Sequence, residues 1–344
     1  MPPLRDWPIH DSLPGGSRRP PVPRLPLAHL PTPIWHCRAL DELVGTEVWV
    51  KRDDMTAGAA AGNKIRKLEF LLGQAVDQQA TVVLTCGAVQ SNHARATALL
   101  AAQLGLRSVL FLRTTDPDVP HATTGNLMLD RLVGAEVRFI TGDQYAARDP
   151  LMVEAADELR KAGERAYVIP EGGSNGLGAL GYVEAMREVR AQLDLGLGGG
   201  PTGFEAVVHA CGSGGTAAGC ALGAALHRVA PTVLAMAVCD DRERFEAIIA
   251  RIANESAALI GEDRPRCDLR VIDDFRGPAY GVASDAQREF IGTVARRSGL
   301  IVDPVYSGKA LYGLAHLVEK PRRVLFLHTG GLPGLLAQAD QFDR

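Results

Sequence analysis

The chain has 344 residues, 46% of them hydrophobic, and a formal net charge of -3. This length and composition predict a globular protein with one large or two ordinary domains, because a chain of this size can bury a substantial core. Acidic and basic residues are interspersed without a long basic run, which argues against a nucleic-acid or acidic-lipid partner.

The cysteines and the amino terminus indicate the cellular compartment. None of the six cysteines forms a C-x-x-C pair, and most lie in apolar or small-residue segments, which is typical of free, buried thiols in a reducing cytosol. The amino terminus is polar and rich in proline, without the apolar core of a signal peptide. Because no apolar run reaches the roughly 18 residues of a membrane span, we predict a cytoplasmic protein.

Short apolar runs alternate with helical patterns along the chain. Residues 1–33 are rich in proline and are expected to form an extended arm. Ile65, Leu68 and Leu72 recur at helical spacing and predict a helix that follows Lys64. The other predicted helices cover 92–105, 125–134, 149–163, 216–229 and 284–299, and the predicted strands cover 47–54, 81–87, 107–114, 135–141, 166–171, 205–211, 233–241, 268–273 and 323–328.

This alternation of strands and helices predicts an α/β protein with mostly parallel sheets and helices on both faces. A glycine-rich break over 195–203 separates the early strands from the late ones, so we expect two sheets. No internal repeat of fixed period is evident.

The segment C-G-S-G-G-T-A-A-G over 211–219 follows a predicted strand and opens a helix. Backbone N–H groups and the helix dipole would face an anion there, and phosphate is the expected ligand. The glycines also imitate a dinucleotide loop, and Asp240 and Asp241 end the next strand, where a ribose-binding carboxylate would lie. An NAD-dependent oxidoreductase is therefore an alternative, beside a tight turn that only permits close helix packing.

Two further polar segments have competing interpretations. G-G-S-N-G over 172–176 matches a hydrolase nucleophile elbow at Ser174, but an elbow turns directly into a helix, and the glycines that follow favour a loose loop. In the segment 87–96, Ser91 or Asn92 can cap the next helix. His93 alone indicates a structural histidine, and since no second histidine or cysteine has metal-ligand spacing with it, no metal is predicted.

Lys64 lies where a small-residue loop meets a predicted helix. The positive end of the helix dipole lowers the pKa of a lysine there and exposes a neutral, nucleophilic amine. An ordinary surface lysine is the alternative. Arg66 and Lys67 are interpreted as flanking charges, with Lys67 pairing with nearby acids.

Seven motifs together resemble those of the pyridoxal-phosphate enzymes that include D-cysteine desulfhydrase and 1-aminocyclopropane-1-carboxylate (ACC) deaminase. In chain order they are KRDDMTAGAAAGNKIRKLEFLL, CGAVQSNHARA, EGGSNGLGALGY, CGSGGTAAG, GPAYG, DPVYSGKALYGL and LHTGGLPGLL. The resemblance spans residues 30–336 and implies the tryptophan-synthase-β-like fold (fold type II), with two three-layer α/β/α domains and the cofactor pyridoxal 5'-phosphate between them. It implies a small domain over 66–178, a large domain over 1–65 plus 179–344, and a homodimer.

The resemblance also implies roles for individual residues. Lys64 matches the lysine that binds the cofactor covalently, Asn92 the residue that contacts its ring oxygen, and Thr329 the residue that faces its ring nitrogen. The phosphate-binding loop corresponds to Gly212, Ser213, Gly214, Gly215 and Thr216. The residues on the side of the small amino-acid substrate are Ser91, Asn92, His93, Tyr280 and Tyr306, and the catalytic set is Lys64, Ser91, Tyr280 and Tyr306.

The implied activity is a β-elimination similar to that of D-cysteine desulfhydrase, which yields pyruvate, ammonia and hydrogen sulfide. ACC deaminases have motifs resembling D-P-V-Y-E and H-L-G-G, whereas this chain has Ser307 and Thr329 at the distinguishing positions. A neutral hydroxyl at the ring nitrogen makes the ring a weaker electron sink, so that a leaving group such as thiolate is needed. L-cysteate sulfo-lyase, ACC deaminase and a non-catalytic phosphate-ligand sensor remain alternatives. Ala61 departs from the family pattern G-G-N-K, and a shift of the loop before Lys64 is expected to follow from it.

Overall fold

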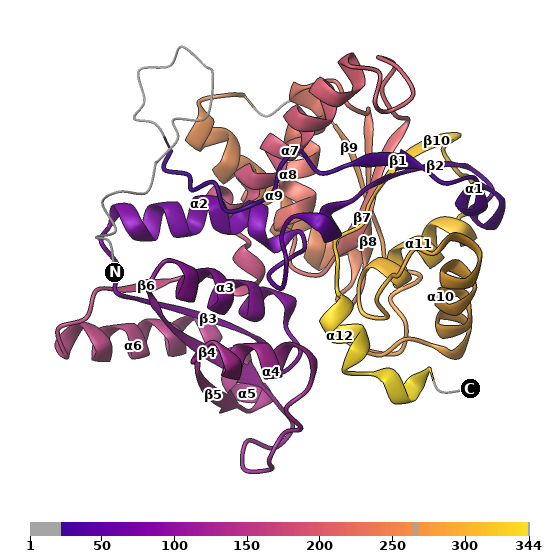
Figure 1. Cartoon of the computed structure of the whole chain (residues 1–344). Coiled ribbons are helices and arrows are strands. Elements are labelled where there is room, and N and C mark those ends of the chain that lie inside the picture. The colour runs from indigo at the N-terminus through magenta and orange to yellow at the C-terminus, as the bar shows by residue number, and fades with distance from the viewer. Residues whose placement is uncertain (1–21, 264–266, 343–344) are drawn as a thin grey trace.

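The computed structural model describes residues 22–263 and 267–342, which form two sheets surrounded by helices (Figure 1). The strands are β1 (Ile34–His36), β2 (Glu47–Lys51), β3 (Val82–Ala88), β4 (Arg107–Arg113), β5 (Glu136–Ile140), β6 (Ala166–Val168), β7 (Ala206–Cys211), β8 (Thr232–Ala237), β9 (Asp268–Ile272) and β10 (Arg323–Leu327). The first helices are α1 (Arg38–Val44), α2 (Lys64–Asp77), α3 (Asn92–Gln103), α4 (Gly125–Leu132), α5 (Gly142–Ala146), α6 (Arg148–Lys161) and α7 (Gly176–Asp194). They are followed by α8 (Gly215–Leu226), α9 (Arg242–Ile260), α10 (Asp285–Ser298), α11 (Ser307–His316) and α12 (Leu332–Leu336), and short 3-10 turns are η2 (Asp53–Met55), η3 (Glu171–Gly173) and η4 (Ala339–Gln341).

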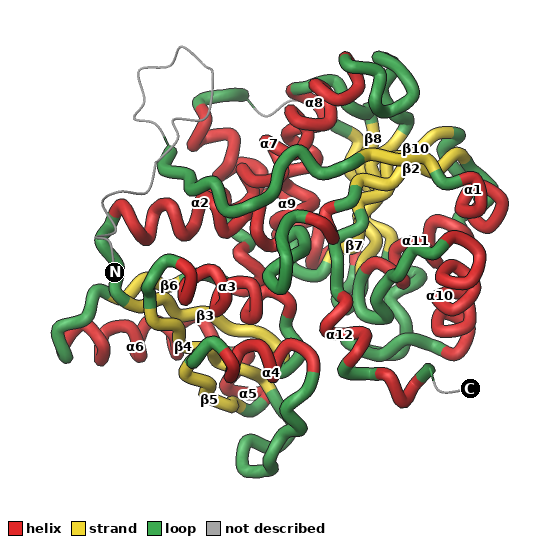
Figure 2. The backbone as a smooth tube through the Cα atoms, viewed as in Figure 1, coloured by secondary structure: helices red, strands yellow, loops and turns green. Residues whose placement is uncertain are grey.

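The two sheets draw their strands from different parts of the chain (Figure 2). The larger sheet has the order β1-β2-β10-β7-β8-β9 and the smaller one has the order β5-β4-β3-β6. Every strand pair is parallel except β1 with β2. The predicted α/β class with two mostly parallel sheets is therefore confirmed.

Apolar residues cover both faces of the larger sheet, as parallel strands require. All six residues of β7 are buried. Val208 packs in one apolar cluster with Val48 and Phe326, whereas its neighbour Val207 packs in another cluster with Leu325. Consecutive side chains of a strand point to opposite faces, so these two clusters form the core layers on either side of the sheet.

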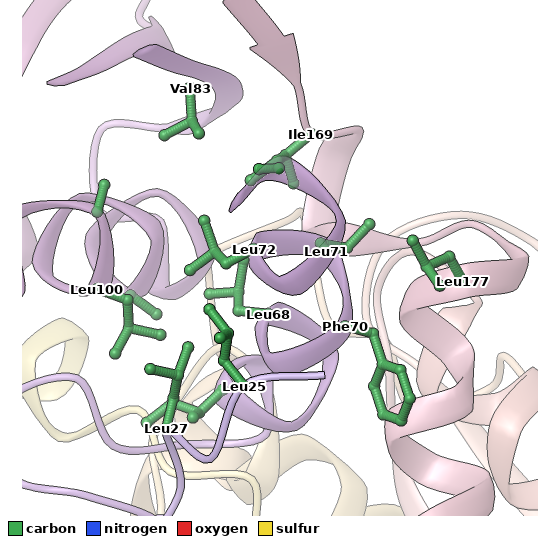
Figure 3. Packing of buried hydrophobic residues seen from close by; sticks show 14 of the residues in the cluster. Leu25, Leu27, Leu68, Phe70, Leu71, Leu72, Val83, Leu100, Ile169 and Leu177 are labelled. Carbon is green, nitrogen blue, oxygen red and sulfur yellow. The ribbon is translucent and has the colours of Figure 1, made fainter. Parts of the chain in front are cut away.

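Helix α2 is packed on several sides and lies in the largest of the apolar clusters (Figure 3). Leu68, Phe70, Leu71 and Leu72 of α2 are fully buried. Their partners come from the arm, from α3, from the smaller sheet and from α7, and include Leu25, Leu27, Leu100, Val83, Ile169 and Leu177. The described part of the arm, residues 22–33, forms no helix or strand, as predicted, and its backbone N–H at Leu25 donates to the Glu69 carbonyl at 3.0 Å. The predicted arm otherwise lies outside the described residues.

The expectation of a loose loop after Ser174 is wrong, because α7 begins at Gly176. The side chain of Asn175 caps this helix by accepting a hydrogen bond from Gly178 N at 2.8 Å. A Cβ atom at Gly181 would lie 2.2 Å from the carbonyl oxygen of Arg66 in α2. The glycines therefore permit close packing of α7 against its neighbours, and periodicity alone does not distinguish this use of glycine from a loop.

Arg66 and Lys67 are also not flanking surface charges, since both are buried. The Arg66 guanidinium donates to Asp53 at 2.8 Å and to Glu188 at 2.9 Å, and the Tyr182 hydroxyl donates to Asp53 at 2.6 Å. Burial alone would raise the pKa of Asp53, but the Arg66 guanidinium holds that pKa below its usual value. This buried network joins α2, α7 and the turn after β2.

Besides α7, the elements that the sequence patterns did not predict are the strand β1 and the helices α1, α5, α9, α11 and α12. The six cysteines are free thiols as predicted, but only Cys86, Cys211 and Cys220 are buried, whereas Cys37, Cys239 and Cys267 are partly exposed. Within residues 22–263 and 267–342, no helix has both the length and the apolar character that crossing a membrane requires.

Candidate active site

A pocket lies where the carboxyl ends of β7 and β10 meet the first turns of α2 and α3. Ligands of open parallel sheets bind at this end of the strands. Several segments of the chain line the pocket, and they contribute Asn63, Lys64, Asn92, Ala210, Cys211, Gly212, Ser213, Gly214, Thr216, Ala217, Tyr306 and Thr329. Eight of the residues singled out in the sequence are thus brought together, while Ser91, His93, Gly215 and Tyr280 lie behind or beside this lining.

Lys64 is the first residue of α2, and its side chain faces the pocket. Its Nζ donates a long hydrogen bond of 3.5 Å to the carbonyl oxygen of Gly172. Burial lowers the pKa of Lys64 to about 8, although the carboxylate of Glu171 opposes this shift. The direction agrees with the sequence prediction, but loss of solvent rather than the helix dipole is the main cause.

The loop before Lys64 is held in place by backbone contacts with neighbouring segments. The positive φ of 129° falls on Gly62, where a Cβ atom would lie 2.9 Å from the carbonyl oxygen of Thr329. Ala61 is not among the residues with positive φ, and its carbonyl accepts a hydrogen bond of 2.7 Å from Arg95. Asn63 N donates to Thr329 O at 3.2 Å, which ties the loop to the segment after β10. Ala61 is therefore accommodated in this loop without an unusual backbone conformation.

The glycine-rich loop joins β7 to α8 and passes close to its neighbours. Gly214 has φ of 81°, and a Cβ atom there would lie 2.8 Å from Ile248 Cγ2. A Cβ atom at Gly215 would lie 2.7 Å from the hydroxyl of Ser174. Asn63 Nδ2 donates to Thr216 Oγ1 at 3.1 Å, which brings the starts of α2 and α8 together. Two helix amino termini therefore border one pocket, and such termini favour an anion.

Lys67 lies beneath this loop and has a carbonyl and a hydroxyl as partners instead of the predicted acids. Its Nζ donates to Gly172 O and to Ser174 Oγ, both at 3.1 Å. Burial and the nearby Lys64 hold the pKa of Lys67 well below its usual value. Ser174 also shares a hydrogen bond of 2.8 Å with Ser213, so this serine supports the loop, and no histidine among residues 22–263 and 267–342 is its partner.

The carboxylates that follow β8 make their contacts with the next helix, α9. Asp241 is the N-cap of α9 and accepts a hydrogen bond from Arg244 N at 2.9 Å. This use of Asp241 differs from the ribose contact that a dinucleotide site requires.

The turn after β3 places Ser91 and His93 behind the pocket and Asn92 in its lining. Ser91 Oγ accepts a hydrogen bond from Ala94 N at 3.1 Å, which confirms the predicted helix cap. His93 is buried, its Nε2 contacts Thr85 Oγ1 at 2.9 Å, and burial holds its pKa well below the usual value. A neutral structural histidine, as its residue context predicted, fits these contacts.

Tyr280 and Tyr306 form a hydrogen-bonded pair at the edge of the pocket. Their hydroxyl oxygens lie 2.6 Å apart, and burial raises the pKa of Tyr280 to about 12. Tyr306 N and Ser307 N donate to the carboxylate of Asp303 at 2.9 and 2.8 Å, which fixes the turn that carries Tyr306. The Ser307 hydroxyl also donates to Asp303, at 2.6 Å, and Ser307 is not part of the pocket lining.

A wider cleft continues from the pocket, with Gly212 and Ser213 lining both. The Tyr145 hydroxyl in this cleft donates to Glu171 at 2.5 Å, and Arg148 pairs with Glu171 at 2.9 Å. Arg113 and Tyr280 also line the cleft. The sequence interpretation missed Arg113 and Tyr145 because they come from β4 and α5 and form no local motif, and it gave no role to Glu171, although this residue begins the motif EGGSNGLGALGY.

Comparisons with known proteins agree with this geometry. The family described as "Pyridoxal-phosphate dependent enzyme" matches residues 25–330. The chain is 43% identical over 327 residues to the bifunctional D-cysteine desulfhydrase/1-aminocyclopropane-1-carboxylate deaminase of Arabidopsis thaliana, with 92% of this chain and 80% of that protein covered. It is 38% identical to the D-cysteine desulfhydrase of Yersinia enterocolitica, with 93% and 97% covered. A solved structure titled as an ACC deaminase homologue superposes with a TM-score of 0.83 at 37% identity, with 93% and 95% covered.

Proposed function

The chain belongs to the family of pyridoxal-phosphate dependent enzymes, and we propose that it is a β-elimination lyase that converts D-cysteine to pyruvate, ammonia and hydrogen sulfide. The observation that carries this proposal is the presence of the Lys64 amine and the paired hydroxyls of Tyr280 and Tyr306 around one phosphate-type loop. If the leaving group is not sulfide, the proposed substrate is a related β-substituted amino acid.

The donor set of the pocket fits pyridoxal 5'-phosphate. We propose that the N–H groups at the start of α8, from Gly212 to Thr216, hold its phosphate, since backbone donors at a helix terminus are suited to an anion. Lys64 would bind its aldehyde carbon, Asn92 would contact its ring oxygen, and Thr329 would face its ring nitrogen. When bound, the cofactor supplies a conjugated ring that accepts negative charge from the substrate α-carbon.

The protein groups around that ring are proposed to move protons. The pKa of Lys64, about 8, places a neutral amine within reach near physiological pH, as a general base requires. Ser91 and the tyrosine pair would assist it, and Tyr306 or Tyr280 would donate a proton to the departing sulfur. The hydrogen bond of 2.6 Å between the two hydroxyls provides a path for that proton.

The contacts of Ser307 favour desulfhydration over ring opening of ACC. The family pattern of ACC deaminases has glutamate at this position, whereas the Ser307 hydroxyl is engaged by Asp303. With serine at position 307, this position would bring no carboxylate to the ring nitrogen, and the Thr329 hydroxyl in the pocket lining would face it. Without a carboxylate to keep the ring nitrogen protonated, a substrate with a good leaving group is preferred.

The proposal is tested by incubating the holoenzyme separately with D-cysteine, L-cysteine, L-cysteate and ACC and measuring keto-acid release. We expect D-cysteine to give pyruvate together with sulfide at the highest rate. Sulfite from L-cysteate or 2-oxobutanoate from ACC as the main product would instead establish L-cysteate sulfo-lyase or ACC deaminase activity. No keto acid from any of the four would contradict the lyase proposal.

We also propose that the protein is a cytoplasmic homodimer whose small domain is formed by 66–178 and whose large domain is formed by 1–65 and 179–344. Exposed apolar side chains of the contacting helices α4 and α12 support an interface between copies, because monomers rarely leave such patches uncovered. They are Met128, Leu132, Leu332 and Leu336. The free thiols support a reducing compartment. Light scattering of wild type and of Leu132→Glu tests the interface.

A further inference from the structure

Arg113 stands out among the residues of the cleft that continues from the pocket. It ends β4, and its guanidinium carbon lies 4.8 Å from the ring centre of Tyr145 and 5.6 Å from that of Tyr280. Stacking on two aromatic rings restrains the planar guanidinium and leaves its N–H edge available for an acceptor. Tyr280 in turn bonds Tyr306 at 2.6 Å, so Arg113 lies on the tyrosine side of the pocket.

The other arginines of this cleft already have acidic partners. Arg148 pairs with Glu171 at 2.9 Å, Arg244 with Asp240 at 3.7 Å and Arg251 with Glu255 at 2.5 Å. Across residues 22–263 and 267–342, no carboxylate lies within 4.0 Å of the Arg113 guanidinium. A restrained, partly buried guanidinium without a protein anion is suited to bind an anion from solution.

We infer that Arg113 is a specificity-determining residue that binds a negatively charged group on the substrate β-carbon. This inference rests on the proposed β-elimination, in which the negatively charged group is the thiolate that leaves D-cysteine, and an unreactive β-sulfonate serves as a probe of the same position. The α-carboxylate is assigned to the turn of Ser91 and Asn92, whereas the β-substituent points toward the tyrosines that would protonate it. Arg113 is the cation beside those tyrosines.

The decisive measurement is calorimetric binding of two unreactive ligands to the holoenzyme. Propanoate carries only the carboxylate, and 3-sulfopropanoate adds a sulfonate at the β-position; neither has an amine that can react with the cofactor. We expect the wild type to bind 3-sulfopropanoate more tightly. In Arg113→Gln, the Kd for 3-sulfopropanoate should rise by about 10-fold or more, as for a lost charge-assisted hydrogen bond, while the Kd for propanoate stays within a factor of two.

Matched variants separate this role from a structural one. Arg251→Gln removes an arginine of the same cleft that has its own acidic partner, and it should leave both Kd values unchanged. Arg113→Lys keeps the charge without the planar fork and should recover part of the preference. The visible absorption of the bound cofactor and the unfolding midpoint should be the same in all variants.

Two results would overturn the inference. Equal weakening of both ligands in Arg113→Gln would show that Arg113 binds the α-carboxylate or only supports Tyr280, and a wild type without preference for 3-sulfopropanoate would show that no β-anion site exists. Keto-acid release is measured separately on D-cysteine, L-cysteine, L-cysteate and D-cysteate. A holoenzyme that prefers 3-sulfopropanoate but releases no keto acid would contradict the lyase proposal and not the assignment of Arg113.

Discussion

The hydroxyl oxygens of Tyr280 and Tyr306 lie 2.6 Å apart, although the two residues come from different loops of the chain. The Lys309 amine holds the Tyr280 loop by donating to the carbonyl oxygens of Arg276 and Ala279 at 2.6 and 3.0 Å. Asp303 holds the turn of Tyr306. The pair is thus preorganised by a buried lysine and a buried carboxylate that do not face the pocket themselves.

Removing one hydroxyl of this pair should impair proton transfer to the leaving group. We expect Tyr306→Phe to lower kcat/KM for D-cysteine by about 100-fold, within the range for loss of a positioned acid or base. Tyr312→Phe is the control, because Tyr312 stacks on His316 at 4.0 Å and does not line the pocket. Steady-state kinetics check this, and equal rates for wild type and Tyr306→Phe would exclude a role of this hydroxyl in proton transfer.

Lys64 and Lys67 should differ in their effect on the cofactor. Lys64→Ala should abolish the visible absorption of the covalently bound cofactor and lower activity by about 1,000-fold or more. Lys67→Met should retain the absorption, because the Lys67 amine is engaged by Gly172 and Ser174. It should lower the free energy of unfolding by about 1–3 kcal/mol, the cost of leaving buried hydrogen-bond partners unpaired. Loss of absorption in Lys67→Met but not in Lys64→Ala would reverse the assignment.

The pH dependence of cofactor attachment should follow the pKa of Lys64, which burial lowers to about 8. Only the neutral amine reacts, so the rate of pyridoxal 5'-phosphate incorporation into the apoprotein should rise about tenfold per pH unit below that value and level off above it. Stopped-flow absorbance between pH 6 and pH 10 measures this rate. A rate that keeps rising through pH 10 would indicate an ordinary lysine pKa.

Breaking the buried ion pair of Arg66 and Asp53 should be costly. Asp53→Asn leaves the Arg66 charge short of a partner and should lower the free energy of unfolding by about 3–5 kcal/mol. The control is Asp157→Asn, which removes an exposed pair with Arg160 and should change stability by less than about 1 kcal/mol.

The same carboxylate should contribute to acid sensitivity. The pKa of folded Asp53 lies below its unfolded value, so its stabilising contribution is complete above the unfolded pKa and is lost as pH falls through the folded pKa. Urea unfolding of wild type at pH 7 and in steps below pH 4 should show this loss, whereas Asp53→Asn should show a smaller decrease over the same range.

Because α7 packs closely on α2, adding a single methyl group at their contact should lower the stability of the protein. In Gly181→Ala the new Cβ would lie 2.2 Å from the Arg66 carbonyl, and the required shift of backbone should cost about 1–3 kcal/mol of unfolding free energy. Gly142→Ala has no heavy atom within 4 Å of its new Cβ and serves as the control. Chemical denaturation of both variants checks this, and equal stabilities would contradict the packing interpretation.

The sequence by itself determined the fold class and most of the candidate pocket. The order of strands and helices is local information, because apolar residues recur with the period of each element. Local patterns also predicted the glycine-rich segment after β7, the turn at Ser91 and the position of Lys64 at the start of a helix. The family motifs added Tyr280, Tyr306 and Thr329.

Only the tertiary structure decided which charges are buried and which residues meet. In the sequence, Arg66 and Lys67 look like surface residues beside the apolar Ile65 and Leu68. In the fold both are buried, because partners more than 100 positions away accept their hydrogen bonds. Arg66 donates to a carboxylate of α7, and Lys67 donates to a carbonyl oxygen of η3. From the sequence alone Gly181 resembles a loop residue, and only the fold shows that the Arg66 carbonyl lies against it. Arg113 joins the cleft through contacts with Tyr145 and Tyr280, which no spacing along the chain encodes, because burial and electrostatic pairing depend on distances that only folding establishes.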